Sequence, residues 1–391
     1  MKKRSIPAAL LLALLLALCA CGQGGTEPQD PDPPQEDPAG QTLSWDELSW
    51  DGSLELDYAQ QFSVDYAGED FARITIDSDV YLLVSEGMEP PAGVPDEVVV
   101  LRQPLQNIYL QATASMDCFR QLDAMDAITL SGTQAEGWYI PEARQAMEEG
   151  RILYAGKYSA PDYELLKSQN CDLALESTMI YHTPEVKEQL ERIGIPVLVE
   201  RSSYEVHPLG RMEWIKLYGV LTGKTEEAEA FFDRQLEQLA PVLEQENTGK
   251  TVAFFAINSN GSVTVRKSGD YIAKAIDMAG GVYAFSDLTS EENALSTINI
   301  QMEIFYQGAK DADILIYNST IDANLTTMEE LLDKSAVLAD FKAVQSGNVW
   351  CTGKSMFQES MSVGNMILDF HTICAEEDPE DDALHYLYRL S

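Results

Sequence analysis

Basic residues and histidine are scarce in this sequence. Its 391 residues include 26 Lys and Arg against 64 Asp and Glu, which gives a formal net charge of −38. Such a charge repels polyanions, so we expect neither nucleic acid nor an anionic lipid surface as a partner. Four histidines are present, and no loop is rich in them. A zinc or manganese site needs several His and carboxylate side chains around the ion, so we predict no metal ligands.

The motifs of common catalytic sites are also missing. The sequence has no Gly-x-Ser-x-Gly elbow, no Gly-x-x-x-x-Gly-Lys phosphate loop and no dinucleotide-binding fingerprint. The doublet Gly280-Gly281 ends a helical pattern and does not open one, which is typical of a helix C-cap. We therefore predict no catalytic residues, no enzymatic activity and no cofactor.

A basic start followed by an apolar run opens the chain. The run at residues 6–20 is too short to span a bilayer comfortably, as in a signal peptide. It ends in the sequence LCACG at 18–22, which is similar to a bacterial lipobox and implies acylation of Cys21. Residues 23–41 are rich in Pro, Gly and acidic residues, so we expect a solvated tether. Loss of the leader would bring the charge to about −41.

Few cysteines remain after the leader. Cys118, Cys171, Cys351 and Cys374 match no zinc spacing. Export would permit disulfides, but these residues lie in or beside apolar runs. We expect buried free thiols.

Short apolar runs alternate with longer amphipathic stretches through most of the chain. The runs lie at 108–110, 128–130, 152–154, 173–175 and 196–199. Such alternation is typical of a parallel sheet covered by helices on both sides. Residues 52–103 show further strand patterns ahead of this region.

A sustained helical pattern interrupts the alternation. Thr225 is the predicted N-cap, with two glutamates in the first turn. A stripe of apolar residues follows at helical spacing: Ala228, Phe231, Phe232, Leu236, Leu239 and Leu243. The helix would be about 30 Å long, with Pro241 kinking or shortening its last turns. The alternation restarts at residue 251.

These patterns predict an α/β protein with two Rossmann-like lobes, each with a central sheet, joined by one long backbone helix. The predicted parts are a signal peptide (1–20), a lipid-anchored flexible tether (21–45), an N-terminal α/β lobe (46–208), a helical linker (209–246, with the backbone helix at about 225–245) and a C-terminal α/β lobe (247–391).

Several stretches carry a resemblance to a known family. They are YELL…CDLAL at 163–175, ERIGIPVLV at 191–199, HPLGRMEWIK at 207–216, AIDMAGG at 275–281 and QMEI…DADILI at 301–316. In this order and spacing, the chain resembles the helical-backbone (class III) substrate-binding proteins of ABC importers for iron siderophores, haem and cobalamin. The resemblance covers roughly residues 95–375, and residues 42–95 match it poorly. It implies a monomeric, membrane-anchored extracytoplasmic receptor that binds a small metal chelate and serves an ABC permease dimer with its ATPase.

Within that resemblance, two glutamates match the family's permease-docking positions. Glu164 and Glu303 each precede the Asp of an Asp-apolar strand by about eight to ten residues. Carboxylates there would pair with permease arginines and fix the docking geometry. The alternative is that each acid only complements a helix dipole.

Ligands of two-lobed α/β proteins lie between the lobes, at the carboxyl ends of the strands. Aromatic rings and a few cations in those loops suit a bulky, planar or anionic chelate. We expect Arg211 and Glu213, by contrast, to form an ion pair at a helix start. The candidate ligand-binding residues are Thr113, Ser115, Trp138, Tyr139, Thr178, Met179, His182, Ser203, Tyr204, Asn258, Arg266, Lys267, Tyr271, Asn318, Lys354 and Phe357.

Three other functions stay open. They are a zinc or manganese receptor of a related type, a lipoprotein with an enzymatic role, and a surface receptor that senses or adheres without an importer. Genes for a permease and an ATPase beside this one would distinguish the last from a transport receptor. The identity of the bound chelate is also open.

Overall fold

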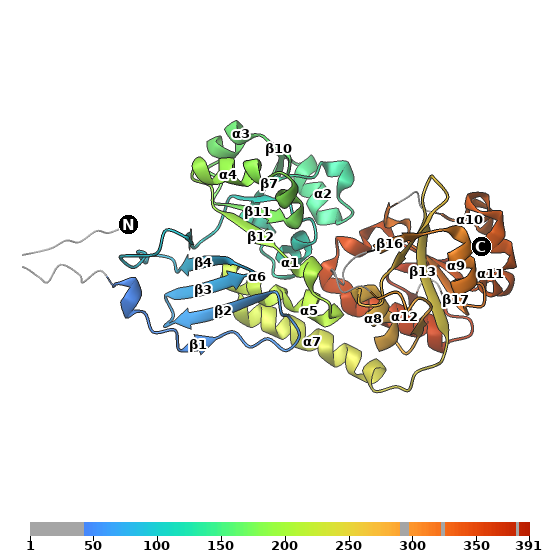
Figure 1. Cartoon of the computed structure of the whole chain (residues 1–391). Coiled ribbons are helices and arrows are strands. Elements are labelled where there is room, and N and C mark those ends of the chain that lie inside the picture. Colours follow the sequence, from blue (N-terminus) through green and yellow to red (C-terminus); the bar gives the residue numbers. More distant parts are fainter. Residues whose placement is uncertain (1–42, 290–296, 322–324, 381–382) are drawn as a thin grey trace, which may run out of the picture. The chain divides into compact units, whose positions relative to one another are not determined.

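Three large β-sheets and a two-stranded one organise the part of the chain that the computed structural model describes, which is residues 43–289, 297–321, 325–380 and 383–391 (Figure 1). The predicted signal peptide, Cys21 and most of the tether lie outside these ranges. Leu43 and Trp45, which we placed in the tether, belong to the fold, since they bond to the Ala92 backbone at 2.7 and 2.8 Å. Within the described ranges, no helix combines the length and the apolar character that crossing a membrane requires.

The first sheet comes from the strand-rich region at 52–103. Its strands run antiparallel, except that β5 is parallel to β4. One face packs on the helical linker through Phe62 and Val64, and the other is covered by Trp45 and Trp50. Residues 46–208 were expected to form one lobe around one sheet, but they hold two separate sheets. The strands are β1 (Gly52–Ser53), β2 (Phe62–Ala67), β3 (Phe71–Ile76), β4 (Asp79–Val84) and β5 (Val98–Arg102).

The second sheet is the parallel sheet that the apolar runs predict, in the order β12-β11-β6-β7-β8. Its three central strands are buried, because helices cover both faces. The strands are β6 (Ile108–Leu110), β7 (Ile128–Ser131), β8 (Leu153–Tyr154), β11 (Leu173–Ser177) and β12 (Val197–Glu200), with a small hairpin of β9 (Gly156–Lys157) and β10 (Ala160–Pro161). The helices are α1 (Ser115–Gln121), α2 (Pro141–Glu148), α3 (Tyr163–Ser168) and α4 (Pro184–Arg192).

Three consecutive helices form the linker: α5 (Pro208–Glu213), α6 (Ile215–Thr222) and α7 (Thr225–Leu243). The long helix α7 contains Pro241 and ends two residues beyond it, slightly before the predicted end. Its N-cap is Lys224, so the prediction of Thr225 as the cap is wrong by one residue. Leu243, the last residue of the predicted apolar stripe, is exposed, and its neighbour Val242 is buried instead. Helix α7 packs against α6 and against α12 (Val363–Ala375) of the C-terminal lobe.

The third sheet forms the core of the C-terminal lobe, in the order β16-β14-β13-β17-β18-β19, with β15 beside β13. The strands are β13 (Thr251–Ile257), β14 (Val263–Arg266), β15 (Val282–Tyr283), β16 (Thr297–Ile300), β17 (Ile314–Tyr317), β18 (Val349–Thr352) and β19 (Leu387–Arg389). The helices are α8 (Tyr271–Met278), α9 (Met302–Ala309), α10 (Met328–Lys334), α11 (Lys342–Ser346) and α12 (Val363–Ala375).

The four cysteines of the folded part are buried free thiols, as predicted. Burial raises the pKa of the Cys171 thiol to about 11 and that of the Cys374 thiol to about 12. Both side chains are therefore neutral and poorly nucleophilic near neutral pH.

A buried carboxyl in the second sheet makes the stability of the protein depend on pH. Neither oxygen of Glu176 has a hydrogen-bond partner among the described residues, and burial raises the pKa of this group from 4.5 to about 8. The folded protein keeps the proton up to about pH 8, whereas the unfolded chain releases it above about pH 4.5. The free energy of unfolding therefore falls as pH rises through this window.

We expect Glu176→Gln to remove this part of the pH dependence, because an amide does not ionise. The difference in free energy of unfolding, variant minus wild type, should rise by a few kcal/mol from about pH 5 to pH 8. Urea unfolding at several pH values measures it, with the exposed Glu188→Gln as the control. Parallel pH profiles for wild type and Glu176→Gln would contradict the assignment.

Candidate functional site

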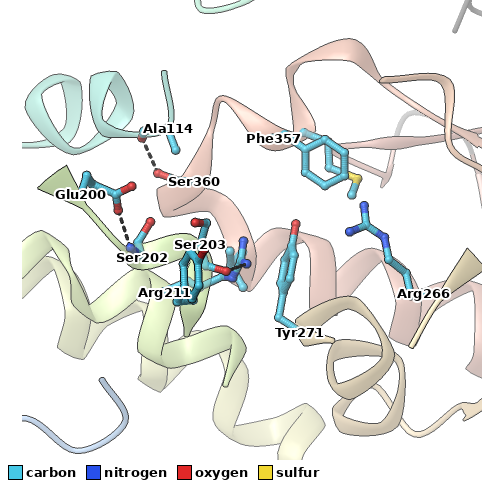
Figure 2. A pocket seen from close by; sticks show the side chains of 12 residues that line it. Ala114, Glu200, Ser202, Ser203, Arg211, Arg266, Tyr271, Phe357 and Ser360 are labelled. Atoms are coloured by element: carbon cyan, nitrogen blue, oxygen red, sulfur yellow. Dashed lines mark hydrogen bonds between the residues drawn. The ribbon is translucent and has the colours of Figure 1, made fainter. Parts of the chain in front are cut away.

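A cavity of about 420 Å³ lies where the second sheet, α5 and the C-terminal lobe meet. Figure 2 shows aromatic and charged side chains directed into it from both sides. The volume falls in the range of small-molecule sites. The lining residues are Ala114, Glu200, Ser202, Ser203, Tyr204, Arg211, Arg266, Tyr271, Met356, Phe357, Ser360 and Val363.

The N-terminal wall of the cavity is the loop that follows the carboxyl end of β12. Ligands of parallel sheets bind against loops at this end of the strands. Glu200 is the last residue of that strand and accepts a hydrogen bond of 2.7 Å from the backbone N–H of Ser202. Burial raises the pKa of Glu200, although the bond to Ser202 opposes the shift. The next loop residues, Ser203 and Tyr204, continue the wall.

Arg211 supplies a cation from α5. Its Nη2 donates to the Ser203 carbonyl at 2.6 Å, and its Nε donates to the Glu205 carbonyl at 3.3 Å. The guanidinium lies over the ring of Tyr271, with Cζ 3.6 Å from the ring centroid. Burial lowers the pKa of Arg211, and the nearby Tyr271 and Asp270 oppose this shift. An arginine stays protonated under such conditions. Among the described residues, its hydrogen bonds go to carbonyl groups and it forms no ion pair with a carboxylate.

A second cation stands on the other side of Tyr271 (Figure 2). Arg266 ends β14, and its Nη1 lies 3.5 Å from Asp270, the N-cap residue of α8. Its Cζ is 5.3 Å from the ring centroid of Phe357, which faces Tyr271 across the cavity. Burial raises the pKa of the Tyr271 phenol, and the two arginines oppose the shift. The phenol is therefore a neutral hydrogen-bond donor near neutral pH.

Hydrogen bonds join the two lobes beside the cavity. The Gln358 side chain donates to the Gly137 carbonyl and accepts from the Tyr139 N–H, both at 2.7 Å. Ser360 Oγ donates to the Ala114 carbonyl at 2.6 Å. The Met361 N–H donates to the buried Asp117 at 2.8 Å. Residues 354–362 are thus both a cavity wall and an attachment between the lobes.

Five of the predicted ligand-binding residues line this cavity. They come from three places far apart in the chain: Ser203, Tyr204, Arg266, Tyr271 and Phe357. They were predicted because their loops follow the carboxyl ends of strands. The topology brings these loops together.

The other eleven predicted residues do not line the cavity. Three are buried with partners inside their own lobe: Ser115 bonds to the Tyr218 hydroxyl, Trp138 Nε1 donates to Ser131, and Asn318 accepts from Thr320. Tyr139, Met179 and His182 are exposed. Thr113, Thr178, Asn258, Lys267 and Lys354 are half-buried.

The sequence prediction missed several lining residues and misjudged one. Glu213 pairs with Lys216 at 2.8 Å and not with Arg211, so the expected ion pair at the helix start is wrong. Arg211 points to the cavity instead. Glu200 was missed because a carboxylate ending a buried strand gives no sequence signal. Ala114 and Ser202 also lie outside the predicted set, although their loops after β6 and β12 were expected to face the ligand. The remaining lining residues outside that set are Met356, Ser360 and Val363.

The two predicted docking glutamates occupy equivalent places in the two lobes. Glu164 and Glu303 are exposed in the first turns of α3 and α9. The Asp residues that follow them also correspond: Asp172 accepts from the Gln106 and Asn107 N–H groups, and Asp313 accepts from the Thr251 N–H.

In the described ranges, no group of three or more His, Cys, Asp and Glu side chains is placed to hold a metal ion.

Comparison with known proteins gives a family and a fold. The family model described as "Periplasmic binding protein" matches residues 120–355. An uncharacterized lipoprotein of Methanocaldococcus jannaschii is 26% identical over 308 residues, which is 75% of this chain and 71% of that protein.

Solved structures share the fold at low sequence identity. A periplasmic haem-binding protein of Pseudomonas aeruginosa aligns with a TM-score of 0.55 and 16% identity, over 73% of this chain and 99% of its own. The petrobactin-binding protein of Bacillus subtilis aligns with a TM-score of 0.55 and 12% identity, over 70% of this chain and 93% of its own.

We expect Asp117→Ala to loosen the attachment between the lobes, because the buried Met361 N–H loses its acceptor. The free energy of unfolding should fall by about 1–3 kcal/mol, and hydrogen exchange across residues 354–362 should accelerate. Glu142→Ala is the matched control, since Asp117 pairs with Arg120 at 2.6 Å and the exposed Glu142 pairs with the same arginine at 3.8 Å. Unchanged exchange in Asp117→Ala would mean that this bond does not hold the segment.

Proposed function

Because the chain belongs to the periplasmic binding protein family, whose members are binding proteins and not enzymes, we propose that it is the lipid-anchored receptor of an ABC importer. In this proposal, Cys21 carries the anchor outside the cytoplasmic membrane, and the cavity between the lobes captures an anionic iron chelate, either a siderophore complex or haem. The protein acts as a monomer and passes the chelate to the permease.

The pair of guanidinium groups around Tyr271 carries the proposal about the ligand. The chain has a net charge of −38, yet its interlobe cavity presents Arg211 and Arg266. Placing a cation in a partly desolvated site costs free energy unless an anion compensates it. Arg211 lacks a carboxylate partner among the described residues, so an anionic ligand group would supply the compensation through charge-assisted hydrogen bonds.

The aromatic surfaces support a planar or bulky ligand. Tyr204, Tyr271 and Phe357 offer ring surfaces on both sides of the cavity. Rings bind planar groups by stacking, and arginines stack on the same groups. In such a chelate, the chelating molecule supplies the ligands of the metal. The protein would then contribute cationic groups and ring surfaces, and it would need no metal-ligating side chain.

Glu164 and Glu303 are the proposed permease contacts. Each lobe presents one exposed carboxylate at an equivalent place. Two such contacts would let the permease read the separation of the lobes. Favourable interaction with a helix dipole explains one acid in a first turn, but it predicts no difference between these two and other first-turn acids.

We expect Arg211→Ala and Arg266→Ala each to weaken binding of an anionic chelate by about 10- to 100-fold, the loss of a charge-assisted hydrogen bond. Tryptophan quenching measures binding of haemin, a ferric catecholate, a ferric hydroxamate and cyanocobalamin. Arg151→Ala, at an exposed arginine paired with Glu149, is the control. Binding of cyanocobalamin or of the ferric hydroxamate alone, neither of which carries an anionic metal centre, would contradict an anionic ligand. Unaltered affinity in both cavity variants would also contradict it.

For docking, we expect the double variant Glu164→Ala/Glu303→Ala to bind the chelate normally and to lose uptake in cells. The matched control is Glu185→Ala/Glu329→Ala, which removes one exposed first-turn acid from α4 and one from α10. Uptake assays with the labelled chelate should separate the two pairs. Equal uptake by both double variants would rule out the docking role of Glu164 and Glu303.

A further inference from the structure

The first sheet precedes the region that matches the family, yet it is bound tightly to the helix that carries Arg211. The contact is made by residues 57–61, the segment that leads into β2, and by two carboxylates near α5. All these groups lie within the described residues of the N-terminal half. We call residues 57–61 the entry loop.

Glu213 at the end of α5 holds the first half of the entry loop. Its Oε1 accepts from the Asp57 N–H at 2.9 Å, and its Oε2 accepts from the Tyr58 and Ala59 N–H groups at 2.8 and 2.7 Å. Lys216 Nζ neutralises the buried carboxylate at 2.8 Å. Three consecutive backbone donors therefore depend on one side chain.

Glu205 holds the second half of the loop and also contacts Arg211. Its carboxylate accepts from the Gln60 and Gln61 N–H groups at 2.9 and 2.8 Å, and from Trp214 Nε1 at 3.0 Å. Its backbone carbonyl accepts from Arg211 Nε at 3.3 Å. Glu205 therefore hydrogen-bonds to the entry loop through its side chain and to the Arg211 guanidinium through its backbone carbonyl.

Gly210 shows how closely the two parts fit. A Cβ atom at this position would lie 2.9 Å from the Tyr58 carbonyl oxygen and 3.3 Å from Glu205 Oε2. The obstacle is backbone, which cannot turn aside as a flexible side chain could. Tyr58 adds a stacked contact with His207, with ring centroids 4.8 Å apart. The residue directly after Gly210 is Arg211.

We infer that Glu205 and Glu213 are positioning residues for ligand binding, which clamp the entry loop of the first sheet onto α5 and thereby hold Arg211 toward the cavity. This inference rests on the proposed function of the cavity. A helix of six residues does not hold its position alone, since most helical stability comes from packing. A long arginine side chain loses conformational entropy when it binds a ligand. A fixed helix and the two carbonyl acceptors already order the Arg211 side chain before the ligand arrives, so less entropy is lost on binding.

A double-variant cycle tests the inference. We expect Gly210→Ala and Glu205→Gln each to weaken binding at least fivefold, measured with the tightest-binding probe among haemin, the ferric catecholate and the ferric hydroxamate. In an Arg211→Ala background the same changes should alter affinity less than twofold, because they act through Arg211. The same loss of affinity in the wild-type and Arg211→Ala backgrounds would overturn the inference.

A second measurement needs no ligand. The Nε–Hε signal of Arg211 in ¹⁵N NMR, assigned by its loss in Arg211→Lys, should shift or broaden in Gly210→Ala and in Glu205→Gln. Gly308→Ala is the control, because its Cβ would meet Phe285 at 2.5 Å in the C-terminal lobe. An unmoved Arg211 signal would overturn the inference. If no probe binds the wild type, the proposed function fails, and the NMR signal still decides the positioning role.

Discussion

Backbone N–H groups that leave water must find an acceptor, and in this protein carboxylates from distant parts of the chain provide many of them. Glu205 and Glu213 take five N–H groups of the entry loop. Asp369 of α12 takes those of His385, Tyr386 and Leu387 and so holds the C-terminal strand. Part of the acidic excess is therefore structural, and composition alone does not distinguish it from a charged surface.

The helical linker and the hydrogen bonds between the lobes together fix the arrangement of the two lobes around the cavity. Helix α7 packs on α6 and on α12, and a side chain at Gly364 would lie 2.8 Å from Gln235 of α7. Both lobes thus rest on one helix, and residues 354–362 join them again beside the cavity. A cleft built this way favours small changes of lobe separation, so ligand affinity would depend mostly on groups already in place.

Most of the fold could be predicted from the sequence, because its signals are local. Apolar runs and helical stripes identified the parallel strands and α7, and strand ends identified Ser203, Tyr204, Arg266, Tyr271 and Phe357 as cavity residues. What failed depended on contacts between distant residues. Arg211 lies in the cavity because Glu213, its expected partner, binds the entry loop. The separate first sheet was also missed, since strand patterns do not reveal which strands pair.

The order of the chain bears on how this protein acquires its shape as it leaves the ribosome or an export channel. The entry loop emerges early, but its acceptors Glu205 and Glu213 lie 144 to 156 residues later. Until they appear, the strands at 52–102 can form hairpins but cannot settle against α5. The first sheet can therefore pack fully only after the rest of the N-terminal half has emerged. A chain that stops before that point would expose the apolar face of this sheet, which holdase chaperones bind.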